Sequence, residues 1–288
     1  MTRQPLFGPG GNSKSFYDAG YKSTLDAPAF VASFGLDAYE YEAGNGLAAG
    51  DAALSAIGDA AEHAGIAMSL HAPYFISLTT PEPEKREKSI GYVKASLHAA
   101  RLLGARTVVV HMGGVAKMSR EEGMRNSAEA LYRLFESIDE PGTVIGLETM
   151  GKINQLGTLS EVLTLCTMDK HLAPVVDFGH LNARALGGDG GFHSKDDYMR
   201  VFDEIACTLG DYAACHLHAH FSKIEYTGAG EKRHLTFEDA EYGPAFEPLM
   251  EAIYTLGVTP TIICESAGTM AEDALRMKRY YCALEGRP

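Results

Sequence analysis

The chain has 288 residues, of which 45% are hydrophobic and 22% are charged, so it can bury a sizeable core without disulfides or structural metals. It carries 25 Lys and Arg against 38 Asp and Glu. The net charge of -13 argues against a protein that coats nucleic acid with a basic surface, although a local basic patch is compatible with it. The five cysteines form no CxxC pair, and no apolar run approaches the roughly 18 residues of a membrane span. We therefore expect a soluble, cytoplasmic protein that does not enter membranes.

Short apolar segments alternate with stretches whose apolar residues recur at helical spacing, a pattern typical of a parallel sheet. The predicted strands are Leu6–Pro9, Ala38–Glu42, Ala67–Tyr74, Thr107–Met112, Thr143–Thr149, Pro174–His180, Ala214–Ser222 and Thr261–Ser266. The predicted helices are Leu25–Phe34, Ala52–Ala64, Pro83–Leu103, Arg120–Ile138, Leu159–Cys166, Lys195–Leu209, Ala245–Leu256 and Ala271–Tyr281. Eight such pairs, with no linker between halves, predict a single α/β domain over residues 1–288, a (β/α)8 TIM barrel rather than a doubly wound sheet.

Two long segments, Leu181–Ser194 and Lys223–Tyr242, are expected to be loops that follow predicted strands. In a (β/α)8 barrel the loops after the strands surround the active site, so both segments are candidates for substrate contacts. A tolerated surface insertion explains their composition equally well.

The histidines and acidic residues of most interest fall at the carboxyl ends of predicted strands, or just after one. They are His71, His111, Glu148, Asp177, His180, His218, His234 and Glu265. In a barrel these ends meet at one rim. One such residue alone is usually a hydrogen-bonded polar group, but eight crowded carboxylates and imidazoles need neutralisation, which divalent metal ions provide. The sequence therefore predicts a metal centre.

Imidazole and carboxylate donors without thiolates indicate zinc or manganese rather than calcium or magnesium. Because four ligands saturate one zinc ion, eight donors predict two or three ions that share a bridging carboxylate. Clusters of this kind typically hydrolyse phosphoesters. His216, His218 and His220 alternate along one predicted strand and are expected to face the barrel interior together. Only one of the three is needed as a ligand, and His216 is expected to lie deepest.

The motifs resemble those of the endonuclease IV family, metal-dependent apurinic/apyrimidinic endonucleases within the xylose-isomerase-like TIM barrels. The resemblance spans nearly the whole chain and depends, in order, on FGPGGN, HAPY, VVVHMGG, GLETM, VVDFGHLNA, HFSK followed by GEKRH, and CES. It implies a zinc enzyme of DNA repair that cuts the DNA backbone 5′ to abasic sites. The implied ligands are His71, His111 and Glu148 for one ion, the bridging Glu148 with Asp177, His218 and Glu265 for a second, and His180 with His234 for a third.

The chain departs from the family at the third zinc site. The family takes a carboxylate two residues before the histidine of its final motif, and that position is Lys232 here. Glu231 lies one residue further back and is the candidate substitute. The segment EAGNGLAAG also has none of the basic and aromatic residues with which the family penetrates DNA.

Tyr74 matches a family position beside the flipped-out abasic nucleotide. The candidate DNA contacts are Lys14, Lys117, Lys152, Lys223 and Arg233, which ordinary surface charge would also explain. We therefore expect Tyr74, Lys223 and Arg233 to bind substrate, and Glu148 and Glu265 to be catalytic.

A sugar isomerase or epimerase of the same superfamily is the main alternative. Such enzymes use one metal ion, for which Glu148, Asp177, His218 and Glu265 would suffice. Glu148 and Glu265 would then move the proton beside a carbonyl group. The acidity of the chain favours a small sugar as substrate, whereas the additional histidines favour the nuclease. A noncatalytic metal-stabilised scaffold explains the fold but not the concentration of donors at one rim.

Overall fold

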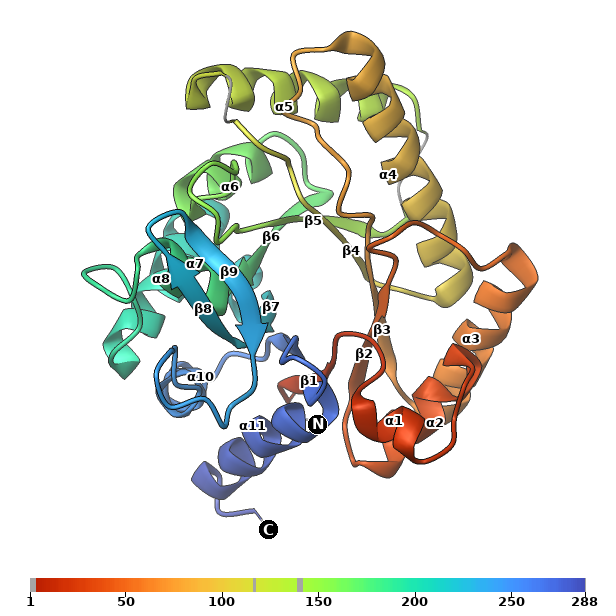
Figure 1. Cartoon of the computed structure of the whole chain (residues 1–288), viewed down its shortest axis with the longest axis vertical. Coiled ribbons are helices and arrows are strands. Elements are labelled where there is room, and N and C mark those ends of the chain that lie inside the picture. The colour runs from red at the N-terminus through yellow and green to blue at the C-terminus, as the bar shows by residue number, and fades with distance from the viewer. Residues whose placement is uncertain (1–3, 116–117, 139–141, 288) are drawn as a thin grey trace.

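A computed structural model describes residues 4–115, 118–138 and 142–287. Its main sheet has eight parallel strands in the order β1-β10-β7-β6-β5-β4-β3-β2 (Figure 1). The strands are β1 (Leu6–Pro9), β2 (Ala38–Glu42), β3 (Ala67–His71), β4 (Thr107–Val110), β5 (Val144–Glu148), β6 (Leu172–Asp177), β7 (His218–Phe221) and β10 (Thr261–Cys264). A parallel bridge between Gly10 and Glu40 links the two ends of the sheet. The predicted (β/α)8 barrel is confirmed as a nearly closed barrel.

Helices surround the strands on the outside of the barrel (Figure 1). They are α1 (Lys14–Asp18), a 3-10 turn η1 (Thr24–Asp26), α2 (Ala27–Ser33), α3 (Asp51–Ala64), α4 (Pro83–Leu103), α5 (Arg120–Glu136), α6 (Leu159–Cys166), α7 (Phe178–Arg184), α8 (Lys195–Leu209), α9 (Asp211–Cys215), α10 (Glu247–Leu256) and α11 (Met270–Leu284). Among the described residues, no helix is both long and apolar enough to cross a membrane.

The helix ends follow local backbone chemistry. Pro83 occupies the first turn of α4, where its missing N–H is tolerated, and Gly104 ends that helix with φ +64°. Gly257 ends α10 in the same left-handed conformation, with φ +65°. A glycine with positive φ therefore ends both helices.

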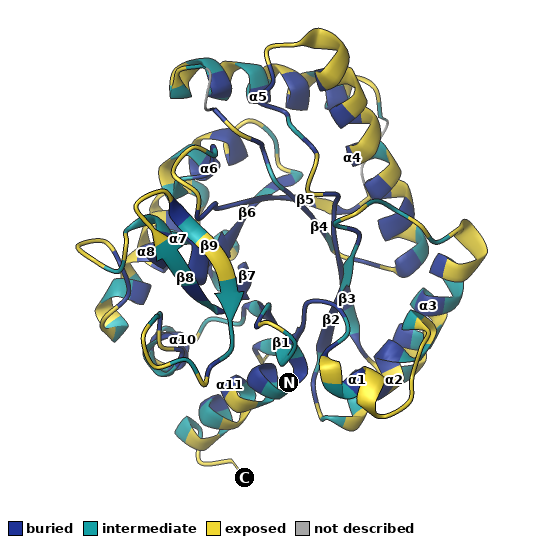
Figure 2. Ribbon diagram, viewed as in Figure 1, coloured by how far each residue is buried: buried dark blue, intermediate teal, exposed yellow. Residues whose placement is uncertain are grey.

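The core lies between the strands and the inner faces of the helices, where Figure 2 shows the buried residues. Close packing of β1 against β2 requires a glycine, because a Cβ at Gly8 would lie 1.8 Å from the carbonyl oxygen of Ala38. Leu70 on β3 and Val108 on β4 are completely buried. Continuous apolar runs of this kind are expected of parallel strands that are covered by helices.

Three predicted segments are wrong in detail. Residues 178–184, predicted as the end of one strand and the start of the following loop, form α7 instead. The Asp177 side chain starts this helix because it accepts a hydrogen bond from the backbone N–H of His180. Residues 211–215, partly predicted as strand, form α9. The charged segment after β7 is an antiparallel hairpin, β8 (Lys223–Thr227) and β9 (Gly230–Leu235), rather than a loop.

Candidate metal centre

The carboxyl ends of the parallel strands carry the predicted donors toward one opening of the barrel, and α7 and the β8–β9 hairpin add others from the side (Figure 1). Glu148 ends β5 and His71 ends β3, while His111 and Glu265 directly follow β4 and β10. Because the strands are parallel, their ends meet at this rim. The structure therefore has the predicted cluster of donors at the carboxyl end of the barrel.

Glu148 is the centre of the cluster. Its Oε2 lies 3.2 Å from Nε2 of His71 and 2.7 Å from Nε2 of His111. Its Oε1 lies 3.2 Å from Nδ1 of His180 and 3.3 Å from Nδ1 of His220. One carboxylate, 1% exposed, thus has two imidazoles beside each oxygen, which is the arrangement that a carboxylate bridging two ions requires.

A second group of donors consists of Glu148, Asp177, His220 and Glu265, whose ligand atoms lie within 4.8 Å of one another. His220, not His218, belongs to this group. Nδ1 of His220 lies 3.4 Å from Oε1 of Glu265, whereas Nε2 of His218 faces Glu40 at 3.0 Å. The alternation along β7 places both side chains inside the barrel, as predicted, but at different heights. His216 lies before β7, at the end of α9, and its Nδ1 is 3.1 Å from the carbonyl oxygen of Tyr212.

The third group consists of His180, Glu231 and His234. Nε2 of His180 lies 3.4 Å from Oε2 of Glu231, and its Nδ1 lies 2.9 Å from the carbonyl oxygen of Thr149. Such a backbone contact orients the ring and leaves Nε2 as the nitrogen for a ligand. The Oγ atom of Ser222 lies 2.9 Å from Nδ1 of His234.

A β-bulge explains how Glu231 reaches this group although it lies one residue further from His234 than the carboxylate of the endonuclease IV family does. In the hairpin, Glu225 pairs with Arg233 and Tyr226 pairs with Glu231, so Lys232 is the extra residue of the bulge. Without a bulge, residues 231 and 234 would face opposite sides of β9. The backbone N–H of Glu231 also donates to the carbonyl oxygen of Gly151 at 3.2 Å, which fixes the hairpin against the loop after β5.

Several buried polar atoms at the rim have no hydrogen-bond partner among the described residues. They include Glu148 Oε1, Asp177 Oδ2 and His220 Nδ1, all from the second group. Buried carboxylate and imidazole atoms are rarely left unpaired because their desolvation is expensive. Divalent cations would neutralise them, and the mixed N and O donors suit zinc or manganese, so these residues fit a metal centre.

The pKa values reflect the crowding of these charges. Burial by itself lowers the pKa of His71, but the hydrogen bond to Glu148 and the charge of Glu42 raise that pKa to about 10. Burial raises the pKa of Glu148, but the charge and hydrogen bond of His111 help to hold it well below its usual range. For Glu265, burial and the repulsion of neighbouring carboxylates raise the pKa despite the charge of His220. The imidazoles and carboxylates of the cluster thus shift one another's pKa values.

Tyr74 lies at the rim, as predicted for a substrate contact. Its side chain is half exposed, and its ring stacks on that of His111 with centroids 5.4 Å apart. Its hydroxyl donates to Oε2 of Glu42 at 3.0 Å. The other oxygen of Glu42 is buried and has no hydrogen-bond partner among the described residues.

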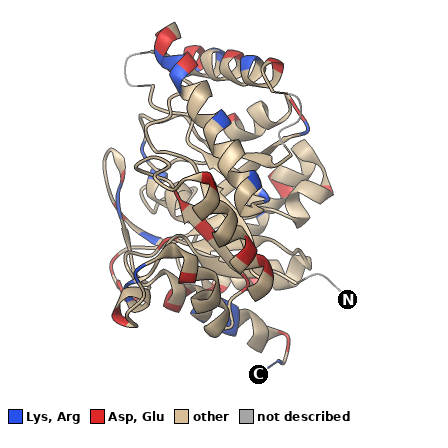
Figure 3. Ribbon diagram, turned by 90° about the vertical axis from the view of Figure 1, so that its right-hand side faces the viewer, with Lys and Arg blue, Asp and Glu red and all other residues tan. Residues whose placement is uncertain are grey.

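The other two predicted substrate contacts are already paired within the chain. Lys223 donates to the carbonyl oxygen of Asp239, and Arg233 pairs with Glu225 at 2.6 Å. Lys14 pairs with Asp18 at 2.5 Å, and Lys117 lies outside the described residues. On the face shown in Figure 3, Lys and Arg are interspersed with Asp and Glu and form no basic stripe.

Sequence reasoning missed Glu40 and Glu42, and it named His218 where His220 meets the other donors. The alternation in AYEYE was the available signal, because residues 40 and 42 of a strand share a face. Glu40 is completely buried, and its two oxygens lie 3.0 Å from Nε2 of His218 and 2.9 Å from Nε2 of His220. It belongs below the rim rather than on it.

Proteins similar to this chain include an uncharacterized protein and several probable endonucleases 4. An uncharacterized protein of Methanocaldococcus jannaschii is 30% identical over 75% of this chain and 77% of its own length. A probable endonuclease 4 of Acholeplasma laidlawii is 29% identical, and the match covers 64% of this chain and 62% of that protein. The chain therefore spans less than two thirds of the length of that endonuclease.

Solved structures share the fold at low sequence identity. Endonuclease IV from Thermus thermophilus superposes with a TM-score of 0.68 and 22% identity, covering 98% of this chain and all of that one. A D-tagatose 3-epimerase-like protein superposes with a TM-score of 0.70 and 18% identity, covering 98% of both chains. These scores support the barrel and do not separate the two activities. The model of the xylose isomerase-like TIM barrel family matches residues 28–280, and the chain therefore belongs to that family.

Proposed function

We propose that the rim binds two or three divalent metal ions and hydrolyses a phosphodiester. Zinc is the proposed metal because the donors are imidazole and carboxylate, and manganese is the alternative. The proposed substrate is DNA with an abasic site, cut 5′ to the lesion. The observation that carries the proposal is the position of Glu148 between four imidazoles, two beside each oxygen.

The proposed ligands divide into three groups, the first two of which share Glu148. They are His71, His111 and Glu148; Glu148, Asp177, His220 and Glu265; and His180, Glu231 and His234. We transfer the ligand role that the family resemblance implied for His218 to His220. A centre with one ion would use the second group only and would leave His71 and His111 without a role.

When bound, the ions would supply Lewis acidity, which lowers the pKa of water to about 7 and stabilises negative charge on a reacting phosphate. Glu148 is buried and would hold the other ligands of both ions in position. Glu265 is 14% exposed, so it meets both the other donors and solvent, and we assign it the transfer of protons between them. The ring of Tyr74 offers an apolar face at the rim on which a sugar or base would stack.

The test is cleavage of a duplex with a synthetic abasic site by zinc-loaded protein, compared with the variants Glu148→Gln and His98→Gln. His98 lies exposed on α4, where it pairs with Asp51, and serves as the matched control. We expect the control to cleave like the wild type and Glu148→Gln to lose activity together with the two ions that share this carboxylate. Activity of Glu148→Gln at the wild-type level would contradict the proposal.

A sugar isomerase or epimerase is the second candidate, and two observations favour it. Lys223 and Arg233 are engaged within the chain, and Glu42 has a buried oxygen without a partner at the rim among the described residues, suited to accept a sugar hydroxyl. In this reaction Glu148 and Glu265 would move the proton beside the carbonyl of a ketose. Interconversion of ketose epimers, with one ion lost in Glu148→Gln and no cleavage of abasic DNA, would establish this candidate in place of the first.

A further inference from the structure

A second cluster of donors lies inside the barrel, nearer the amino ends of the strands than the rim. It consists of Glu40 on β2 with His218 and His220 on β7, whose ligand atoms lie within 4.8 Å of one another. We propose that these residues bind an additional divalent cation, with zinc favoured by the two imidazoles and one carboxylate. This inner site does not depend on which reaction the rim performs.

The carboxylate of Glu40 has two imidazoles beside it and pairs with no Lys or Arg among the described residues. Its Oε2 is 3.0 Å from Nε2 of His218, in hydrogen-bond geometry. Its Oε1 is 2.9 Å from Nε2 of His220, but the two atoms are not aligned, and each is without a hydrogen-bond partner in the described part of the chain. All three side chains are at least nine-tenths buried. A buried carboxylate oxygen and an imidazole nitrogen that face each other without a hydrogen bond are suited to share a cation.

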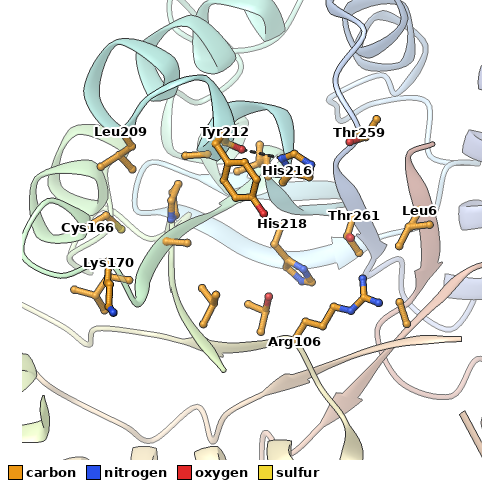
Figure 4. A pocket seen from close by; sticks show the side chains of 18 of the residues that line it. Leu6, Arg106, Cys166, Lys170, Leu209, Tyr212, His216, His218, Thr259 and Thr261 are labelled. Carbon is orange, nitrogen blue, oxygen red and sulfur yellow. Dashed lines mark hydrogen bonds between the residues drawn. The ribbon is translucent and has the colours of Figure 1, made fainter. Parts of the chain in front are cut away.

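A cavity of about 1350 Å³ opens at the amino ends of the barrel strands, on the side away from the rim. Residues at the start of the strands line it, including Leu6, Thr107 and Thr261. His218 also lines it, and Figure 4 shows its imidazole among the lining side chains, next to Thr261, its partner on β10. An ion would therefore reach Glu40 past His218 without crossing the rim.

The inner site and the rim meet at one imidazole. Nδ1 of His220 faces Glu148 at 3.3 Å, and its Nε2 faces Glu40. Glu40 and His218 are thus the ligands that belong to the inner site alone. If ions occupied both sites together, His220 would bridge them as an imidazolate, and its ring protons would pass to solvent.

Anomalous scattering at the zinc edge tests the proposal directly on crystals of the zinc-loaded wild-type protein. We expect a peak within bonding distance of both Glu40 and His218, in addition to peaks at the rim. The absence of a peak at that position would overturn the proposal, because the residues would then share only protons. Peaks at the inner site with none at the rim would support this proposal and contradict the proposed function.

The matched variants are His218→Ala and His216→Ala, counted for zinc per chain by elemental mass spectrometry. His216 lines the same cavity, where its Nδ1 lies 3.1 Å from the carbonyl oxygen of Tyr212, so its variant controls for changes in the cavity. We expect His218→Ala to lose about one zinc ion per chain and His216→Ala to lose none. An unchanged count in His218→Ala would overturn the proposal. If His218→Ala fails to fold, the wild-type anomalous map still decides.

The variant His111→Ala separates this site from the rim. His111 contacts Glu148 and forms a donor group with His71 and Glu148 at the rim. We expect its variant to lose rim ions and to keep the inner ion. Loss of the ion that lies between Glu40 and His218 in this variant would show that it depends on the rim and would overturn the proposal of a separate site.

Discussion

Oε2 of Glu148 lies 2.7 Å from Nε2 of His111, across the boundary between the neighbouring strands β5 and β4. Glu148 belongs both to the group that contains His71 and to the group that contains Asp177, so it joins the two. A neutral amide at residue 148 would keep the shape of the side chain but would bridge two cations poorly. The first prediction follows from that difference.

We predict that Glu148→Gln lowers activity by at least about 100-fold, because losing even an indirect partner of a metal ligand costs about 10- to 100-fold. The fold should persist, since rim residues contribute more to chemistry than to stability in this architecture. Steady-state kinetics and circular dichroism measure the two effects. If the variant unfolds as well as losing activity, the result would assign a structural role to Glu148 instead.

Strands such as β4 and β10 were predictable because each is a short apolar run that helices cover. The bounds predicted for β1 and β2 are those of the structure. The hairpin β8–β9 was not predictable from apolar runs, since charged residues interrupt both strands and most of their residues are only partly buried. Its docking depends on Gly230, where a Cβ would lie 2.2 Å from the carbonyl oxygen of Gly151. Such a tertiary contact leaves no periodic signal in the sequence.

Most donors at the rim were predictable because a strand end fixes which residues meet there. The choice between His218 and His220 was not, because alternate residues on β7 share a face and differ only in height. Contacts with the rim carboxylates identify His220 as the upper of the two, since its Nδ1 lies 3.3 Å from Oε1 of Glu148 and 3.4 Å from Oε1 of Glu265. The depth of a side chain in a barrel depends on the stagger of all the strands, which a single sequence does not specify.

The bulge on β9 leads to a prediction about adjacent residues. Glu231→Gln should release one ion from the group with His180 and His234, whereas Lys232→Gln should keep it. Lys232 instead contacts Glu225, at the surface. Elemental mass spectrometry of the zinc-loaded variants provides the count. If both variants keep every ion, Glu231 is not a ligand, and if both lose one, the hairpin fold rather than the carboxylate accounts for the loss.

The pair of Arg120 and Glu161 predicts a pH-dependent stability that is independent of the metal centre. Burial raises the pKa of Glu161, but the bonds from Arg120 and from the backbone of Gly157 and Thr158 lower it to about 2. Because the folded pKa is below the unfolded value, the stabilisation is present above about pH 4.5 and is lost as the pH falls toward 2.

We therefore expect Glu161→Gln to lower the free energy of unfolding by about 2 kcal/mol at pH 7, with the difference from wild type shrinking below about pH 4.5. Urea unfolding of metal-free protein at several pH values measures it. Glu129→Gln is the control, because Glu129 is half exposed and pairs with Arg86 across the helices. A difference for Glu161→Gln that stays constant from about pH 7 to about pH 3 would mean that the carboxylate charge is not its source.

Tyr74 gives a prediction about substrate binding that separates its ring from its hydroxyl. The ring stacks on His111, and the hydroxyl donates to Glu42. If the ring supports a sugar or base, Tyr74→Ala should raise KM by about 2- to 10-fold, since an aromatic contact is worth about 0.5–1.5 kcal/mol. Tyr74→Phe keeps the ring and should retain a KM near that of the wild type, with the same metal content. Equal KM values for all three proteins would mean that substrate does not contact the ring, and a rise in Tyr74→Phe as large as in Tyr74→Ala would assign the binding to the hydroxyl and Glu42.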